Sequence, residues 1–238
     1  MKNLFKKIMY FDLLESSNTY LIDLHKCCYI DTPLVVVANN QKKGRGRRGK
    51  KWFSDPNSLT FSFAIPITHK LTNWNISMIT SLALINVLNC YNIKAVIKYP
   101  NDIIINNKKV AGILTEVISL NKTKHCIVGV GLNVNNELFP QNISNAVSIK
   151  NLIFETINKE KLLDNILLEI SSLISVKNII NLYMSALYGS KSSVLCVYRG
   201  SQIYVKVLSV TNRGVLTILI QDQTIRTVND LDISFILS

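Results

Sequence analysis

Hydrophobic and polar positions alternate with two different periods along the chain. In the segment SLTFSFAIP, apolar residues at Leu59, Phe61, Phe63 and Ile65 alternate with smaller or polar ones, which predicts a half-buried strand. Between residues 76 and 92 the apolar residues instead recur at helical spacing, which predicts an amphipathic helix. The two patterns together predict a chain that mixes strands and helices.

The same patterns predict the other elements of residues 1–189. The segment NTYLIDLHKCC reads as a helix that begins after a cap at Ser16 or Ser17. Strands are predicted at PLVVVAN, KAVIKY, DIII, KVAGILTEVISL and KHCIVGVGLNVN, with a hairpin at Asn106 and Asn107. Further helices are predicted from 159 to 175 and over NIINLYMSALY.

The period changes after the small polar linker GSKSS. From there the sequence contains only short, closely spaced strand patterns, namely VLCVYRG, QIYVKVLSV, VLTILIQ, TIRTV and DISFIL. Roughly forty-five residues of this kind have the size and rhythm of a small barrel. We therefore predict two domains, residues 1–189 and an SH3-like β-barrel at 190–238.

Composition favours a globular protein with anionic partners. The 238 residues are 48% hydrophobic and 18% charged, and no apolar run approaches the roughly eighteen residues of a membrane helix. The five cysteines form no CxxC pair and no metal spacing with the histidines, so we expect reduced thiols in a cytoplasmic protein without a removed signal. A formal net charge of +12 favours a nucleotide, a nucleic acid or an acidic protein as partner.

The loop QKKGRGRRGKKWFS at 41–54 holds the densest charge. Between Gln41 and Trp52 every residue is a cation or a glycine. Because like charges repel, we expect this loop to stay open and mobile until an anion binds. Its glycines allow positive φ and let backbone N–H groups approach a ligand closely. Taken alone, the loop also fits a solvated basic surface or a nucleic-acid patch.

Three other segments carry polar side chains at the ends of predicted elements. Ser-Ser-Asn begins the first helix, at 16–18. The segment KYPNDIIINNKKVAG places Asn101 and Asp102 at a strand break and Lys109 just past a hairpin, and GVGLNVN has glycines inside a strand that ends at Asn133. Each segment alone is typical of a helix cap, a turn or a bulge.

Four segments occur in a fixed order along the chain: KGRGRRGKKWFS, YPND, KKVAGIL and GVGLNVN. Together they resemble the biotin protein ligase family, and the similarity runs from about Tyr10 to the C-terminus. The resemblance implies an α+β fold in which helices flank a mixed sheet, related to class II synthetase cores and lipoate ligases, with a small C-terminal SH3-like barrel. It also implies an ATP-dependent ligase that joins biotin and ATP into biotinyl-5′-AMP, with Mg²⁺. Biotin would then pass to the ε-amine of a lysine on a carboxyl carrier protein, such as an acetyl-CoA carboxylase subunit.

The resemblance assigns roles to individual residues. For the ureido head of biotin it implies Ser16, Ser17, Asn18 and Gln41. For the biotin carboxylate and the adenylate phosphate it implies Arg45, Gly46, Arg47 and Lys109, with Lys109, Arg45 and Arg47 catalytic. For the nucleotide it implies Arg48, Trp52, Asn101, Asp102 and Asn133, with Asp102 a candidate Mg²⁺ ligand. The family's Ser-Thr-Asn is Ser-Ser-Asn here, which keeps the hydroxyl.

The residue types suit this chemistry independently of the resemblance. Bringing an anionic carboxylate onto the α-phosphate while pyrophosphate leaves requires dense, preorganised positive charge. Arginines can bind phosphate and carboxylate with two parallel hydrogen bonds, and a lysine adds a compact charge.

Two other functions stay open, and so does the assembly. Lipoate or octanoate transfer would use the same fold, and a nucleic-acid-binding protein would bind with strong salt dependence and without ATP. Only about ten residues precede the matching region, so we expect neither a winged-helix domain nor specific DNA binding. We expect no membrane attachment, and the resemblance leaves open whether the chain forms a homodimer.

Overall fold

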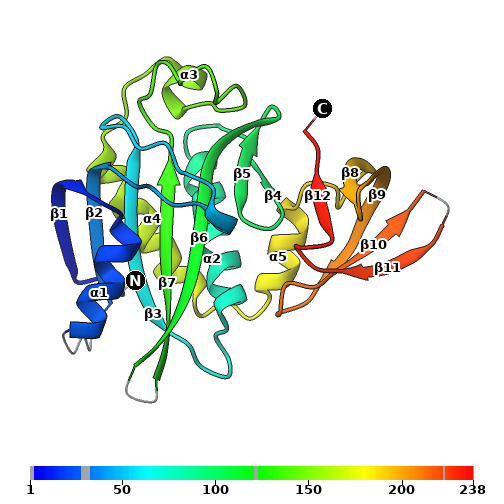
Figure 1. Ribbon diagram of the computed structural model, residues 1–238, viewed down its shortest axis with the longest axis horizontal. Helices are drawn as coiled ribbons and strands as arrows, with labels where there is room; N and C mark the ends of the chain where they lie inside the picture. Colours follow the sequence, from blue (N-terminus) through cyan, green and yellow to red (C-terminus); the bar gives the residue numbers. More distant parts are fainter. Residues whose placement is uncertain (1–2, 28–32, 121–122, 222, 238) are drawn as a thin grey trace.

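The computed structural model describes residues 3–27, 33–120, 123–221 and 223–237, and their strands form two sheets (Figure 1). The larger sheet is mixed and has the order β1 (Lys7–Leu14), β2 (Leu34–Gln41), β3 (Leu59–Pro66), β7 (Thr123–Leu132), β6 (Lys108–Leu120), β5 (Asp102–Ile105) and β4 (Val96–Lys98). The smaller sheet is antiparallel, in the order β11 (Ile225–Val228), β10 (Leu216–Ile220), β9 (Ser201–Val210), β8 (Val194–Tyr198) and β12 (Ile233–Phe235).

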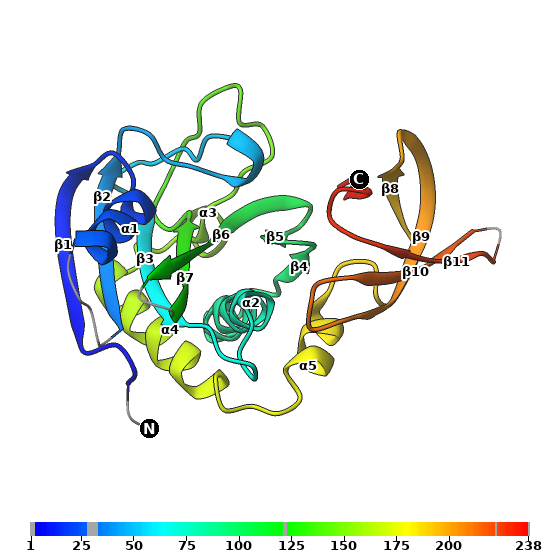
Figure 2. The ribbon, with the colours of Figure 1, turned by 60° about the horizontal axis from the view of Figure 1, so that its bottom comes forward.

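Helices cover both faces of the larger sheet (Figure 2). On one face α1 (Ser17–Cys27) packs against β3 and β7. On the other face α2 (Asn73–Asn89) lies against β5, β6 and β7, with α4 (Lys159–Leu173) and α5 (Ile179–Ala186) packed on it. The short α3 (Ile149–Ile153) follows the loop after β7. These layers confirm a mixed α+β fold with a helix-flanked sheet.

Sequence periodicity located β2 to β12 but not the first strand. β1 pairs in parallel with β2, with Tyr10 opposite Val37, at the edge of the sheet. Its side chains are a mixture of exposed and half-buried positions, so no period of two marks it. The sequence also did not indicate α3, which has a single turn and a Ser148 capping box.

Two predictions of half-burial were wrong. Every residue of β3 from Leu59 to Ile65 is buried, because α1 packs on one face of the strand and the side chains of the other face, such as Phe61 and Phe63, lie in the core that includes α2 and α4. The predicted amphipathic helix α2 is buried on nearly all sides from Ile76 to Ile85, because it lies between the sheet and two other helices. A local pattern does not reveal that a second layer covers the polar-looking side of an element.

The two sheets share one hydrophobic core, which fixes their relative position. Tyr99, just after β4, stacks on Trp74 with ring centroids 5.9 Å apart and meets the ring of Phe235 edge-on at 6.5 Å. Its hydroxyl donates a 2.8 Å hydrogen bond to the carbonyl of Gly214, in the turn between β9 and β10. Burial, the main cause, raises the pKa of this hydroxyl, so it stays protonated and keeps donating. The smaller sheet is therefore held rigidly beside β4.

The cysteines that the structure describes are free thiols: Cys27, Cys90, Cys126 and Cys196. Cys28 lies outside the described residues. Burial raises the pKa of Cys126 to about 12 and that of Cys196 to about 11, so neither forms a thiolate near neutral pH. In the described ranges we find no helix with the length and hydropathy that spanning a membrane requires.

The rings of two histidines lie close together where α1 packs on β7. Their environment predicts that the stability of the fold depends on pH. The rings of His25 and His125 have centroids 5.6 Å apart, and Nδ1 of His25 lies 2.9 Å from the carbonyl of Leu21. Burial, aided by the neighbouring His25, lowers the pKa of His125 below its usual 6.5. The folded protein therefore takes up a proton at His125 only at lower pH than the unfolded chain does.

We expect the free energy of unfolding to fall as the pH drops from 6.5 to the folded-state pKa of His125. The variant His125→Gln should lose this part of the pH dependence. Urea unfolding about one unit above and about one unit below pH 6.5 measures it in both proteins. An equal pH dependence in the variant would contradict the assignment.

Candidate functional site

Two adjoining cavities lie where the loop after β2 crosses β6 and approaches the smaller sheet. Their volumes are about 260 Å³ and about 420 Å³. Both are lined by Lys51, Trp52, Lys98, Asp102 and Lys109, so these residues form the boundary between them. Joined cavities of this kind can hold two ligands whose reacting ends meet.

The structure brings the sequence-predicted site residues together. The first cavity is lined by Ser16, Ser17, Asn18, Gln41, Arg45, Gly46, Arg47, Arg48, Trp52, Asn101, Asp102 and Lys109. Asn133 lines the second cavity. Segments that lie far apart in the sequence, from Ser16 to Asn133, thus contribute to one site.

One end of the first cavity is a polar pocket built on the start of α1. The backbone N–H of Ser17 donates to Oε1 of Gln41 at 2.7 Å, and its hydroxyl donates to the same oxygen at 3.0 Å. The hydroxyl of Ser62 lies 2.7 Å from Oγ of Ser17 and 2.6 Å from Oδ1 of Asn18. The amide of Asn18 donates to Glu116 at 2.8 Å. This network fixes the orientation of each side chain before any ligand arrives.

Two buried polar atoms of the cavity lining lack a partner among the described residues. They are Oγ1 of Thr60, on β3, and Nε1 of Trp52, in the loop. Thr60 is 4% exposed and lies beside the polar pocket. Because an unsatisfied buried hydroxyl or N–H is costly, these atoms point to hydrogen bonds that a ligand supplies.

Glycines in β6 and β7 make room for side chains that lie over the sheet. A Cβ added to Gly129 would lie 2.3 Å from Oδ1 of Asn18, and one added to Gly131 would come still closer to the ring of Trp52. These are the glycines of the segment GVGLNVN, and their neighbours explain why the strand contains them. The strand β7 thus carries no side chain at these two positions, so that Asn18 and Trp52 can lie against its backbone.

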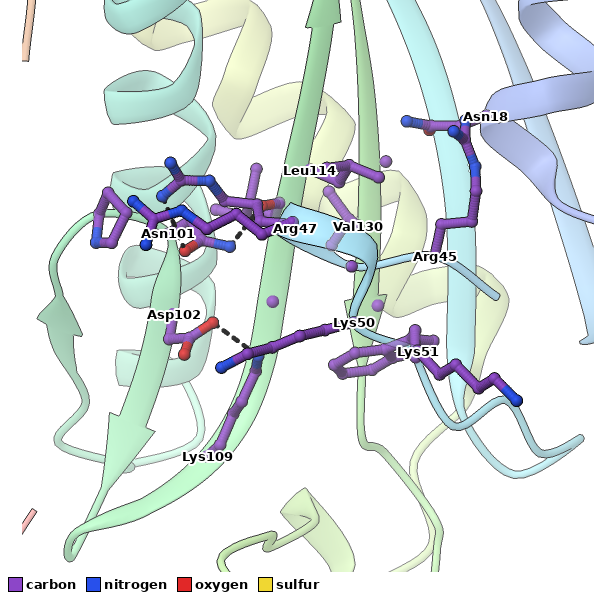
Figure 3. Close-up of a pocket in the computed structure, with 18 of the residues that line it drawn as sticks. Asn18, Arg45, Arg47, Lys50, Lys51, Asn101, Asp102, Lys109, Leu114 and Val130 are labelled. Atoms are coloured by element: carbon purple, nitrogen blue, oxygen red, sulfur yellow. Dashed lines mark hydrogen bonds and ion pairs between the residues drawn. The ribbon is translucent and has the colours of Figure 1, made fainter. Parts of the chain in front are cut away.

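Lys109 lines both cavities and therefore lies at their junction, and Figure 3 shows its side chain beside Asp102. Its Nζ forms a 2.6 Å ion pair with Asp102 and lies 5.4 Å from the ring centroid of Trp52. Its backbone N–H donates to the carbonyl of Asn145 at 2.7 Å, and its carbonyl accepts from Val147 at 3.0 Å. The predicted hairpin at 106–107 just before it is confirmed, with positive φ at both asparagines.

The arginines of the loop are ion-paired, whereas the sequence predicted an open loop without a partner. Arg45 pairs with Glu116 at 2.7 Å. Arg47 and Arg48 both pair with Asp230, in the turn before β12. Figure 3 shows Arg45 beside Asn18 on one side of the cavity and Arg47 on the other. The expected self-repulsion is relieved because carboxylates distant in sequence lie within reach.

Asn133 is buried, and its amide is occupied by the backbone. The side-chain NH₂ donates to the carbonyls of Lys109 at 3.3 Å and Val147 at 3.1 Å. It therefore braces the strand that carries Lys109. Its predicted hydrogen bonds to adenine stay a prediction, and its position in the second cavity is compatible with them.

Sequence reasoning missed Lys98, Glu116 and Asp230. Lys98 lies at the end of β4 opposite Asp102 and lines both cavities. Burial lowers its pKa below the usual 10.5; Asp102 opposes this shift, and the charges of Lys109 and Lys50 add to it. The position of Lys98 directly before Tyr-Pro-Asn-Asp could have indicated it. Nothing in the local sequence marks Glu116 or Asp230.

Fold and site together define a class of protein: an α+β protein whose sheet carries a polar pocket, a cationic centre and a second cavity. The first cavity is lined by the cations Arg45, Arg47, Arg48, Lys50, Lys51, Lys98 and Lys109 and by the carboxylates Asp102 and Asp230. Such a site suits an anionic ligand with a polar head, beside a second anionic ligand.

The chain belongs to the biotin/lipoate A/B protein ligase family, whose family model matches residues 10–133. It is 31% identical over 175 residues to the bifunctional ligase/repressor BirA of Bacillus subtilis, covering 68% of this chain and 51% of that protein. It is 33% identical over 104 residues to the biotin--[acetyl-CoA-carboxylase] ligase of Paracoccus denitrificans, covering 42% of this chain and 43% of that protein. The chain therefore spans about half the length of these relatives.

Among solved structures, the fold is similar to that of biotin protein ligase from Aquifex aeolicus in complex with biotin and ATP. The TM-score is 0.81 at 26% identity, and the match covers 98% of this chain and 100% of that one. The smaller sheet is thus part of the shared fold.

Proposed function

We propose that the protein is a biotin protein ligase, which makes biotinyl-5′-AMP from biotin and ATP and transfers biotin to a lysine of a carboxyl carrier protein. The observation that carries the proposal is the position of Lys109, at the junction of a polar pocket and a second cavity. A similar fold holds biotin and ATP in the Aquifex aeolicus protein, which supports this choice of substrates.

The first cavity would hold biotin. Its ureido head needs donors and acceptors, which Ser16, Ser17, Asn18 and Gln41 supply together with the unpartnered hydroxyl of Thr60. The carboxylate end would then reach Arg45, Gly46 and Arg47. A lipoyl head is apolar and would leave these polar groups unsatisfied, so the site favours biotin over lipoate or octanoate.

The second cavity would hold the nucleotide. Its lining includes the apolar or aromatic side chains of Trp52, Phe53, Phe139 and Ile143, which can pack against a base. Lys51, Lys98 and Lys109 lie where the two cavities meet and would face the α-phosphate. Arg48, Asn101 and Asp102 complete the phosphate side, and Asn133 lies on the adenine side.

In the first step a carboxylate oxygen of biotin attacks the α-phosphorus, and the bond from the α-phosphorus to the bridging oxygen of pyrophosphate breaks. Lys109, Arg45 and Arg47 stabilise the charge that develops on the phosphoryl oxygens. In the second step the neutral ε-amine of the carrier lysine attacks the acyl carbon, AMP leaves, and the amine loses a proton. Asp102, beside Lys109, is the carboxylate available to receive that proton.

Mg²⁺ would enter with the triphosphate. Among the described residues no group of three or more His, Cys, Asp or Glu side chains could hold a metal ion. Among the residues that line both cavities, Asp102 is the one carboxylate, and Mg²⁺ is commonly bound by one carboxylate plus substrate phosphates. The residues present therefore fit a substrate-borne Mg²⁺, which would neutralise phosphate charge.

The proposal also covers the form of the smaller sheet, the domain boundary, the cellular location and the binding partners of the protein. The smaller sheet would be an SH3-like barrel, with the domain boundary between residues 189 and 190. The enzyme would act in the cytoplasm, on carrier protein, without specific DNA binding, alone or as a homodimer. A gel-shift assay at physiological salt tests the DNA expectation, because tight binding to an operator sequence would contradict it.

The decisive experiment is incorporation of labelled biotin into a carboxyl carrier domain, with and without ATP and Mg²⁺. We expect labelling that requires both and that unlabelled biotin suppresses, whereas lipoate and octanoate in excess leave it unchanged. Competition by lipoate or octanoate would favour the related transfer. No labelling, with ATP-independent binding of oligonucleotides that weakens steeply with salt, would favour a nucleic-acid-binding protein.

A further inference from the structure

The carboxylate of Asp230 holds two arginines of the glycine-arginine loop at once. Both Nη2 of Arg47 and Nη2 of Arg48 contact Oδ2 of Asp230, the second at 3.1 Å, and Arg48 also donates to the Asp230 carbonyl. The Asp230 side chain is only 21% exposed, and Asp230 lines the first cavity. One acidic group of the C-terminal segment therefore ties down the loop, 182 to 183 residues away in sequence.

Asp230 is presented by a turn that is itself well fixed. In the turn at 229–232, Oδ2 of Asp232 accepts from the N–H of Asn229 at 3.0 Å. Oδ1 of Asn229 accepts from Leu231 at 2.8 Å, and the carbonyl of Asn229 accepts from Asp232 at 3.1 Å. The following strand, β12, carries Phe235 into the shared core. The hydrogen bonds of the turn thus hold the Asp230 carboxylate in place as an anchor for the loop.

The loop backbone is strained where it reaches this anchor. Arg48 has φ 54° and ψ 42°, the left-handed conformation that non-glycine residues rarely adopt, and Gly49 follows with φ 73°. Such strain persists only where neighbouring contacts maintain it. Two backbone hydrogen bonds close the turn around Arg48, from Lys50 to Arg47 at 3.1 Å and from Gly46 to Lys50 at 2.6 Å. The contacts of Arg48 with Asp230 tie this turn to the C-terminal segment, so their loss would remove part of the support for the strained conformation.

We propose that Asp230 is an internal latch: its carboxylate holds Arg47 and Arg48 in the ligand-free protein and is exchanged for the carboxylate or phosphate of the ligand during binding. This inference rests on the proposed function for the identity of the ligand. Arginine binds carboxylates and phosphates through the same donor groups, so Asp230 and the ligand compete for them. A ligand anion beside an Asp230 that kept its position would also be repelled by it.

The latch would make the loop a two-state element. In the latched state the arginines are unavailable to other anions, and binding of an anionic ligand must include the free energy of breaking the Asp230 contacts. Removing the latch should therefore strengthen binding of ligands that carry the anion. Because the anchor belongs to the C-terminal segment, loop opening also releases the larger sheet from one contact with the smaller one.

The test uses Asp230→Asn, which keeps the shape of the side chain and removes its charge. Without ligands, trypsin should cleave the loop between residues 42 and 51 several-fold faster in this variant than in the native protein. Asp230→Glu, which keeps the charge, should restore at least part of the protection. Asp23→Asn, which removes an exposed carboxylate paired with Lys26 on α1, should change nothing. Equal loop cleavage in the native protein and Asp230→Asn would overturn the latch.

Binding of biotin and of biotin methyl ester, measured by calorimetry, tests the exchange. Asp230→Asn should bind biotin several-fold more tightly than the native protein and should bind the uncharged ester equally. Weaker biotin binding would mean that Asp230 positions the arginines for the ligand and would overturn the exchange. If neither protein bound biotin, the proposed function would fail, while the ligand-free cleavage rates would still decide whether the latch exists.

Discussion

Replacing Lys109 by alanine is expected to slow the formation of biotinyl-5′-AMP by at least about tenfold. The ammonium lies at the junction of both cavities, 2.6 Å from Asp102 and 5.4 Å from the Trp52 ring. Loss of one charge-assisted contact to the reacting carboxylate or α-phosphate costs about 1.5–3 kcal/mol. Because the charge on the phosphoryl oxygens grows toward the transition state, most of this loss should appear in kcat.

Release of pyrophosphate, measured with biotin and ATP at saturating concentrations, follows this step without the carrier. Lys108→Ala is the matched control, since Lys108 is an exposed lysine one position earlier on the same strand. It removes the same charge and should keep the native rate. A rate for Lys109→Ala close to that of Lys108→Ala would remove Lys109 from the centre of the mechanism. Lys109→Arg should recover only part of the rate, because the guanidinium is larger than the ammonium.

The residues that sequence reasoning placed in the site share one property: each lies in a short segment with a distinctive amino-acid sequence. Ser17, Gln41 and Lys109 were assigned from the family resemblance that their local motifs carry, and the structure brings them to one cavity. The fold makes this possible because β2, β6 and α1 all end or begin at the same side of the sheet (Figure 1). Local patterns also sufficed for every strand with a clear period.

The sequence could not show which carboxylate pairs with which arginine of the loop. Glu116 meets Arg45 across 71 positions, and Asp230 meets Arg48 across 182. Neither carboxylate lies in a distinctive segment, and a single chain offers many candidates at such separations. The expected unrelieved repulsion in the loop was therefore wrong, since an estimate of self-repulsion counts only the nearby charges, whereas the mobility of the loop stays a prediction. The same limit explains why burial on both faces of β3 was missed.

Replacing Gly131 by alanine should have an effect of similar size, through Trp52. The added Cβ would overlap the indole, with its Cζ2 and Nε1 among the three nearest atoms. The backbone of Trp52 cannot move away freely, because its N–H donates to Gly44 at 2.9 Å. The ring must therefore rotate away from β7, and it would then no longer lie below Lys109 or beside the second cavity. Overpacking of this kind typically costs about 1–3 kcal/mol.

Gly129→Ala adds the same methyl group two residues earlier on the same strand. Comparing the two variants distinguishes effects on the first cavity from effects on the second. There the added Cβ would meet the amide of Asn18 in the polar pocket. We expect Gly131→Ala to raise KM for ATP by about tenfold or more while KM for biotin changes little, and Gly129→Ala to do the reverse. Thermal unfolding of both variants shows whether the fold survives. If both glycines affected the same substrate, the assignment of one cavity to biotin and the other to the nucleotide would be wrong, because one overlap involves Asn18, in the first cavity, and the other involves Trp52, on the boundary with the second.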